Sequence, residues 1–281
     1  STGQSNGTKT SYVPLIDKIQ ERVNNSTPFF SLEFFPPKTT QGAVNLVARF
    51  DKMSQGGPLF CDITWHAAGN PGGDSESSSI TIAGVALNYC GMETMLHITA
   101  VNLKEEDLKA HLERAKSLGI RNILALRGDH PNANPEYRSD FKYAIDVIRY
   151  IRETYGDYFV ICCSGYPTGH PEAPSYADDI KYLKAKVDAG ANFVITQLFF
   201  QSETFVKFVR DCREAGIEVP ILPGIMPIHS YDTLMKIVGT SQLEVPKCLQ
   251  DAIEPIRSND EAVQKFGIDW ATQMCKEVMD S

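Results

Sequence analysis

The stretch Asn122-Ile123-Leu124-Ala125-Leu126-Arg127-Gly128-Asp129 joins a short apolar run to an arginine and an aspartate. Charged side chains at the end of an otherwise buried strand are costly to bury unless they are paired or bind something. The pattern recurs, because other apolar runs end in Glu33, in Thr64-Trp65-His66, in His97 and in Gln197. Parallel strands that each offer a polar side chain at the same end are typical of a barrel with its active site there.

Strand-like and helix-like segments alternate along the chain. The predicted strands cover residues 30–35, 60–65, 95–99, 122–126, 158–164, 193–198 and 221–225. The predicted helices cover residues 41–54, 81–89, 107–118, 141–154, 176–189, 202–215, 231–238 and 247–253, with a long final helix from Asn259. Gly119 and Gly190 suit left-handed caps after two of these helices. Every connection is long enough to join parallel neighbours.

This alternation predicts the α/β class. A doubly wound sheet is the alternative, but no predicted strand leads into the G-x-G-x-x-G fingerprint, and there is no Walker loop. We therefore expect a TIM-type (β/α)8 barrel. Only seven strands are recognisable before Ser281, so we expect the last strand to be lacking in a catalytic fragment of a longer protein. The expected organisation is a polar lead-in with a short helix in residues 1–26 and the barrel in residues 27–281.

The composition of the chain argues against several classes of function. The 281 residues are 42% hydrophobic, enough for one large core, and the formal net charge is −8 with a pI near 5.3. An acidic balance argues against a nucleic-acid or anionic-membrane surface. No apolar run is long enough to span a membrane, and the polar first residues predict no signal or transit peptide. Seven cysteines without a CxxC pair predict buried thiols in a reducing cytoplasm, with neither disulfides nor a metal site.

Glu33 is a candidate general acid, since it lies between Leu32 and Phe34-Phe35. A carboxyl packed among phenylalanines is expected to be desolvated, which favours its protonated form near neutral pH. The alternatives are a carboxylate that pairs with Lys38 or one that caps the next helix. Asp129 could likewise pair with its neighbour Arg127 or start a turn.

Four other residues leave similar alternatives. Gln197 could bind a ligand edge, because an amide donates and accepts at once, or it could be satisfied by backbone. His97 could be a ligand-binding residue or a satisfied core histidine. Asp179 and Lys186 lie seven residues apart on one predicted helical face, which could also be a solvated, salt-bridged face.

Five segments in the same order and spacing resemble methylenetetrahydrofolate reductase. They are Ser31-Leu32-Glu33-Phe34-Phe35-Pro36-Pro37-Lys38, Asp62-Ile63-Thr64-Trp65, Leu126-Arg127-Gly128-Asp129, Gly169-His170-Pro171-Glu172-Ala173 and Thr196-Gln197-Leu198-Phe199-Phe200. The resemblance runs from about Thr27 onward and is closer to the eukaryotic enzymes. It implies a flavoprotein barrel that binds FAD, takes electrons from NADPH or NADH, and reduces 5,10-methylenetetrahydrofolate to 5-methyltetrahydrofolate by ping-pong hydride transfer. That places it in cytoplasmic one-carbon metabolism and methionine biosynthesis, as a homo-oligomer that is dimeric at full length.

The resemblance also implies a role for particular residues. Glu33 is the general acid that protonates N10 of the folate, Asp129 lies near flavin and pterin, and Gln197 binds the pterin. The implied FAD-binding residues are Thr64, Trp65, His97, Arg127, Gly128, Asp129, Tyr143, Ala144, Tyr166, His170, Pro171, Glu172, Ala173, Asp179 and Lys186. Ala191 is a small residue behind the flavin loops, and enlarging it is expected to loosen FAD.

Two features of the family are not recognisable in this sequence, and both bear on its function. The family continues into an eighth strand followed by folate-binding residues, and its eukaryotic members carry a regulatory domain that binds S-adenosylmethionine. A second hypothesis is therefore a catalytically incompetent FAD-binding or oligomerisation fragment. A third is another barrel flavoenzyme, such as a relative of proline dehydrogenase, against which the Glu33 and Gln197 motifs argue. The sequence does not distinguish NADPH from NADH.

Overall fold

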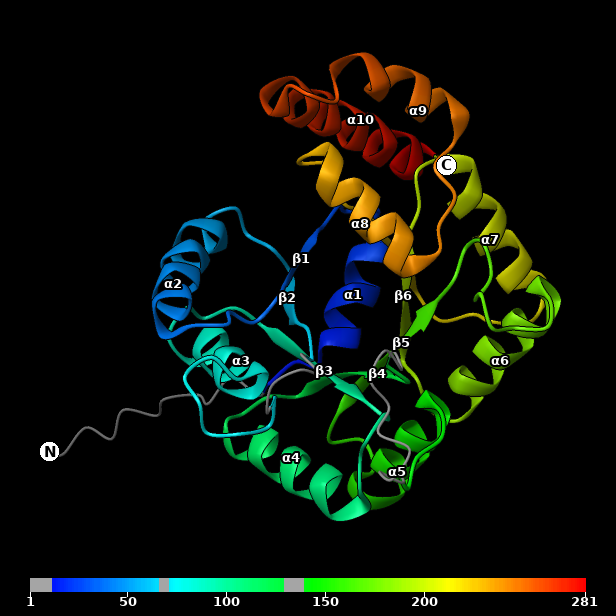
Figure 1. Ribbon diagram of the computed structural model, residues 1–281. Coiled ribbons are helices and arrows are strands. Elements are labelled where there is room, and N and C mark those ends of the chain that lie inside the picture. Colours follow the sequence, from blue (N-terminus) through cyan, green and yellow to red (C-terminus); the bar gives the residue numbers. More distant parts are fainter. Residues whose placement is uncertain (1–11, 66–70, 129–138) are drawn as a thin grey trace, which may run out of the picture. The chain divides into compact units, whose positions relative to one another are not determined.

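A computed structural model describes residues 12–65, 71–128 and 139–281. Its strands form one sheet in the order β1-β2-β3-β4-β5-β6-β7, and helices alternate with them along the chain (Figure 1). The strands are β1 (Ser31–Phe34), β2 (Phe60–Ile63), β3 (Thr94–Thr99), β4 (Asn122–Leu126), β5 (Val160–Gly165), β6 (Phe193–Leu198) and β7 (Ile221–Gly224). The helices are α1 (Leu15–Asn24), α2 (Thr40–Ser54), α3 (Ser79–Asn88), α4 (Glu105–Ser117), α5 (Ala144–Tyr155), α6 (Tyr176–Asp188), α7 (Ser202–Glu214), α8 (Tyr231–Ser241), α9 (Lys247–Ile253) and α10 (Asp260–Asp280).

The predicted α/β, TIM-type fold is confirmed. Strands β1 and β2, β2 and β3, β5 and β6, and β6 and β7 pair in parallel, and sequence neighbours are sheet neighbours throughout. Each predicted strand is present with its ends shifted by two residues or fewer. Gly119 and Gly190 adopt positive φ, +83° and +119°, as the caps required. The chain divides into two compact units, one with residues up to Leu96 and Glu113–Asn122, the other with His97–Leu112 and Ile123–Ser281.

In the first unit, Glu93 ties α1 to the start of β3. Its carboxylate accepts hydrogen bonds from Lys18 Nζ at 2.6 Å, Tyr12 Oη at 2.9 Å and Asn122 Nδ2 at 2.7 Å. Burial, and next the charge of Glu93, raise the pKa of Tyr12. Leu15 and Ile19 of α1 are fully buried, so the helix is held by both apolar contact and this ion pair.

In the second unit, Arg152 of α5 joins the turn that precedes β5 to the turn that precedes β6. Its guanidinium donates to the carbonyl oxygens of Gly190, Gly156 and Phe159 and to Asn192 Oδ1. A Cβ on Gly190 would lie 2.7 Å from Arg152 Nε, so this position needs glycine for space as well as for its φ. The arginine satisfies several backbone carbonyls that strand and helix leave open.

Helices α8, α9 and α10 follow β7 (Figure 1). They contribute to a separate apolar cluster. Its buried members are Phe200, Ile228, Leu234, Leu249, Ile253 and Val263. Trp270 Nε1 of α10 donates to the Phe200 carbonyl at 3.1 Å, and Ser202 Oγ of α7 donates to Glu277 at 2.6 Å. These bonds fix α10 against the segment that follows β6.

The prediction that all seven cysteines are buried is wrong for Cys248. Cys61, Cys162, Cys163 and Cys212 are buried, and Cys90 and Cys275 are partly buried, but Cys248 is exposed. The short helix α9 turns Leu249 and Ile253 inward, which leaves Cys248 on its outer face. All seven are free thiols.

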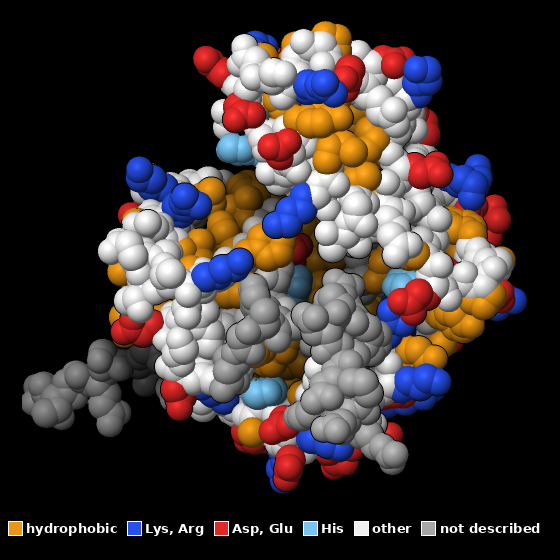
Figure 2. Space-filling view, in the orientation of Figure 1, with side chains coloured by type: hydrophobic (Ala, Val, Ile, Leu, Met, Phe, Trp, Pro, Cys, Tyr) orange, Lys and Arg blue, Asp and Glu red, His pale blue; other side chains and the backbone are white. Residues whose placement is uncertain are grey.

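The surface carries charges of both signs. On the face in Figure 2, Lys and Arg side chains are interspersed with Asp and Glu. None of the helices within the described ranges combines the length and apolar character needed to cross a bilayer.

Candidate functional site

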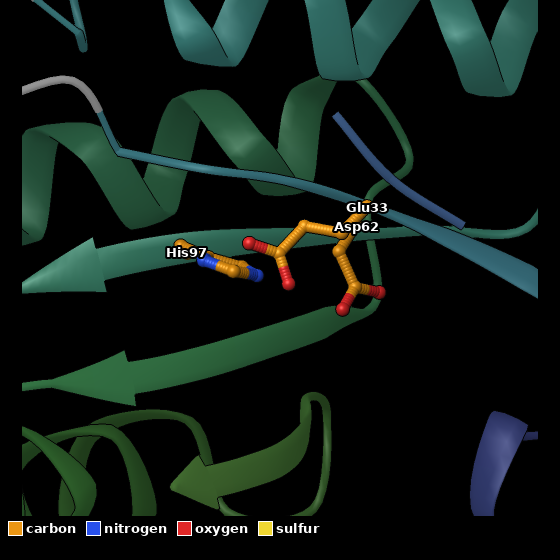
Figure 3. A group of neighbouring side chains, drawn as sticks. All are labelled: Glu33, Asp62 and His97. Atoms are coloured by element: carbon orange, nitrogen blue, oxygen red, sulfur yellow. The ribbon is translucent and has the colours of Figure 1, made fainter. Parts of the chain in front are cut away.

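Glu33 of β1 lies beside a second carboxylate, that of Asp62 (Figure 3). The two residues are register partners in the parallel pair β1–β2, so their side chains lie on the same face of the sheet. A carboxylate oxygen of each lies within 4.8 Å of the other. Asp62 is 2% exposed and was not among the predicted site residues. The sequence could have indicated a role for Asp62, because a carboxylate inside the apolar run Phe60-Cys61-Asp62-Ile63 is costly to bury.

The expectation that phenylalanines desolvate Glu33 is wrong. Glu33 is exposed, and so is Phe35. Successive strand residues point to opposite faces, so Phe34 turns away and packs edge-on against Phe50, with ring centroids 4.8 Å apart. In the part of the chain that the structure describes, Glu33 makes no ion pair with Lys38. The carboxyl group of Glu33 is therefore accessible to a bound substrate.

Thr64 and Trp65 follow the last residue of β2, and both are half-buried. The Thr64 amide donates to the Phe34 carbonyl at 3.0 Å, and Ser79 Oγ donates to the Thr64 carbonyl at 2.8 Å. These bonds extend the β1–β2 pairing and hold the Thr64 backbone at the carboxyl end of the strand.

His97 lies within β3 and is 5% exposed. Alternate strand residues share a face, so His97 is on the face of β3 that carries Met95, the register partner of Asp62 (Figure 3). Its burial fits either of the two interpretations that the sequence left open.

In the second unit, Arg127 follows β4 and forms a two-pronged ion pair. Its Nη1 and Nη2 donate to Oε2 and Oε1 of Glu172 at 2.5 and 2.6 Å. Gly128 has φ +87°, and a Cβ there would lie 2.9 Å from the Cβ of Thr99. A larger residue would need both an unfavourable backbone conformation and more space. Asp129, the second catalytic candidate, lies outside the described residues.

The loop after β5 carries Tyr166 and the residues from His170 to Ala173. The Gly169 amide donates to the Tyr166 carbonyl and the Ala173 amide to the His170 carbonyl, each at 2.9 Å. The rings of Tyr166 and His170 meet edge to face at 4.7 Å. The Glu172 amide donates to His170 Nδ1 at 3.1 Å, so this nitrogen carries no proton. Burial, and next the charge of Arg127, lower the pKa of His170, which favours this neutral ring.

Asp179 and Lys186 of α6 both turn toward β5 and its loop. Asp179 Oδ2 accepts from the His170 amide at 3.2 Å, and Lys186 Nζ donates to the Ser164 carbonyl at 2.6 Å. Asp179 is 9% exposed, and burial raises its pKa. The alternative of a solvated, salt-bridged face is therefore wrong for this pair. Hydrogen bonds join Arg127, the His170 loop and Asp179 into one group, and Lys186 bonds to Ser164 of β5, just before that loop.

Other predicted positions stand apart from this group. Gln197 is half-buried, and its Oε1 accepts from the Leu198 amide at 2.9 Å, as the backbone-satisfied alternative expected. Tyr143 is exposed and precedes Ala144, the first residue of α5. Asp146 accepts from the Tyr143 amide at 2.9 Å, so a carboxylate already holds one amide at this helix start.

Comparison with known proteins identifies relatives. Residues 18–281 match the family model described as methylenetetrahydrofolate reductase. Over 272 residues the chain is 52% identical to a probable methylenetetrahydrofolate reductase (NADPH) of Caenorhabditis elegans, covering 96% of this chain and 41% of that protein. It is 43% identical over 277 residues to methylenetetrahydrofolate reductase (NADH) 1 of Arabidopsis thaliana, covering 94% and 46%. The chain thus spans less than half the length of these relatives.

A bacterial relative and a solved structure extend this comparison. The 5,10-methylenetetrahydrofolate reductase of Pectobacterium carotovorum is 34% identical over 261 residues, covering 92% of this chain and 82% of that protein. An uncharacterized protein from Clostridium thermocellum that binds two copies of 5-methyl-5,6,7,8-tetrahydrofolic acid superposes with a TM-score of 0.64. It is 13% identical and covers 93% of this chain and 86% of its own, which shows the fold.

Proposed function

Because this chain belongs to the methylenetetrahydrofolate reductase family, we propose that it reduces 5,10-methylenetetrahydrofolate to 5-methyltetrahydrofolate. NADPH or NADH supplies the electrons, since the relatives are named for either donor. The single observation that carries the proposal is an accessible carboxyl group, Glu33, at the carboxyl end of β1. The proposal includes the cytoplasm as location and a homo-oligomer as the working assembly.

The second unit fits an FAD cofactor. A diphosphate needs cationic and N–H donors, and Arg127, Lys186 and the backbone amides around His170 are groups of that kind. Gly128 takes a positive φ and packs closely against Thr99, which sets the course of the backbone directly after Arg127. When bound, FAD would supply the hydride relay between the nicotinamide and the folate. Thr64, Trp65, His97, Tyr143, Ala144, Tyr166 and Asp179 remain proposed cofactor-binding residues.

Glu33 supplies the proton that the reaction needs. It protonates N10 of the folate, which opens the imidazolidine ring to the 5-iminium cation that accepts hydride. Asp129 stabilises that cation by its negative charge. Gln197 binds the pterin edge, for which its amide must exchange the Leu198 contact for the ligand.

The visible spectrum of the purified chain tests this function. Under anaerobic conditions, a flavin spectrum that bleaches with NADPH and recovers with methylenetetrahydrofolate would support the whole proposal. A bleach without recovery would favour the FAD-binding fragment with no folate turnover. A colourless chain that FAD cannot reconstitute would contradict the flavoenzyme assignment.

Substituting Ala191→Val is expected to weaken FAD binding several-fold without changing hydride-transfer chemistry. Ala191 is 4% exposed, and its amide donates at 3.2 Å to the carbonyl of Lys186. Two extra methyl groups in this space cost about 1–3 kcal/mol and displace the turn after α6. The rate of FAD release on dilution measures the effect. A matched Ala177→Val variant, on the exposed face of α6, should release FAD at the original rate.

A further inference from the structure

Phe35 is an aromatic residue that the fold leaves open to solvent two positions after the proposed acid. It is 74% exposed, whereas its neighbour Phe34 packs edge-on against Phe50 of α2. Alternate strand residues share a face, so Phe35 follows Glu33 on the face from which Phe34 turns away. Two strand positions correspond to about 7 Å along the backbone.

The backbone on both sides of Phe35 is fixed. The Phe34 carbonyl accepts a hydrogen bond at 3.0 Å from the first amide after β2, which carries the β1–β2 pairing as far as Phe35. Pro36 is buried and has no amide hydrogen with which to continue that pairing. Pro37 packs against the first turn of α2, since a Cβ on Gly42 would lie 3.0 Å from its own Cβ. The exposed ring is therefore held between a strand and a helix start.

An exposed phenylalanine on a fixed backbone favours a ligand that covers it with an aromatic ring. The substrate of the proposed function carries such a ring next to the reacting atom, because N10, which Glu33 protonates, is bonded directly to the p-aminobenzoyl ring. A side chain about 7 Å from the acid is within reach of that ring. The pterin edge, in contrast, has Gln197 as its proposed partner.

We propose that Phe35 packs against the p-aminobenzoyl ring of the folate substrate. The inference rests on the proposed function and deepens it, because it assigns a binding contact for a part of the substrate that a free pterin lacks. The contact belongs to the folate half-reaction alone, so Phe35 is not needed when NADPH reduces the flavin.

Phe35→Ala in the FAD-loaded chain tests this contact. The KM for methylenetetrahydrofolate should rise about tenfold, with kcat and the rate of flavin reduction by NADPH within about twofold. Folic acid carries the same p-aminobenzoyl ring, and its oxidised pterin gives no hydride to the flavin. Its dissociation constant, measured by equilibrium dialysis, should also rise about tenfold. Phe35→Leu keeps an apolar side chain without the flat ring and should give an intermediate loss.

Two controls separate this contact from the loss of an exposed ring in general. Tyr89 is 85% exposed and ends α3 before β3 begins, so it lies at the opposite end of the strands from Phe35. Tyr89→Ala should leave the affinity for folic acid within about twofold. The second control is 6-methylpterin, which has no p-aminobenzoyl ring and should bind equally to the original chain and to Phe35→Ala.

The failures of the two proposals are distinguishable. If the original chain reduces methylenetetrahydrofolate and Phe35→Ala keeps its KM and its affinity for folic acid, the assignment of Phe35 is wrong and the proposed function stands. An equal loss for 6-methylpterin, or an equal effect of Tyr89→Ala, would also overturn the assignment. If the FAD-loaded original chain neither binds folic acid nor reduces methylenetetrahydrofolate, the proposed function fails and the assignment fails with it.

Discussion

Glu33→Gln is expected to slow the reduction of methylenetetrahydrofolate by about 10²–10⁴-fold and to leave flavin reduction by NADPH unchanged. The amide has nearly the shape of the acid but cannot donate an acidic proton. Glu33 is exposed at the end of β1, so the substitution removes a proton donor without disturbing the core. Only the folate half-reaction needs that proton, which is why the two half-reactions should separate.

Anaerobic stopped-flow absorbance measures the two half-reactions one at a time. Glu33→Asp keeps an acid at the position and should retain more folate reduction than Glu33→Gln. If flavin reduction falls as far as folate reduction, Glu33 is not the general acid. Asp62 would then be the next candidate, although its burial keeps it from direct contact with a ligand.

Gly267→Ala is expected to destabilise the protein by about 3 kcal/mol. Helix propensity alone predicts the opposite sign, because alanine is favoured over glycine inside a helix by about 1 kcal/mol. A Cβ at Gly267, however, would overlap the carbonyl oxygen of Ile228 and lie 2.7 Å from its carbon. Since the clash is with backbone, α10 would have to move away from the Phe200–Val263 cluster.

Gly239→Ala is the matched control for this prediction. Gly239 lies in α8, is exposed, and has no atom within 4 Å of the position its Cβ would take. Here propensity acts alone, and the substitution should stabilise the protein by about 0.5–1 kcal/mol. Urea unfolding followed by circular dichroism compares the two variants. Equal effects of the same sign would contradict the close approach of α10 to Ile228.

The folding pattern could be predicted from sequence because it depends on local periodicity. The alternation of apolar runs and helical spacing located the strands, and Asn122–Leu126, Phe193–Leu198 and Lys247–Ile253 were predicted to the residue. Glycines after helices marked left-handed caps, as at Gly119 and Gly190, because few other residues tolerate that conformation. The polar residues that end the strands indicated which end to search for a site.

Side-chain burial was less predictable. Phenylalanines flank Glu33 in sequence, but strand alternation turns Phe34 to the opposite face and Phe35 is exposed. Cys248 directly precedes the buried Leu249, yet the short helix α9 exposes it. Neighbours in sequence therefore did not predict neighbours in space.

The sequence alone determined the order of strands and helices, the parallel α/β class and the residues at the strand ends. Only the tertiary structure decided that Asp62 lies beside Glu33, that Arg127 pairs with Glu172, and that α10 approaches Ile228. Periodicity is a property of a few consecutive residues, so the chain encodes it directly. Contacts across 29, 45 or 39 positions depend on strand register and loop path, which no short stretch of sequence contains.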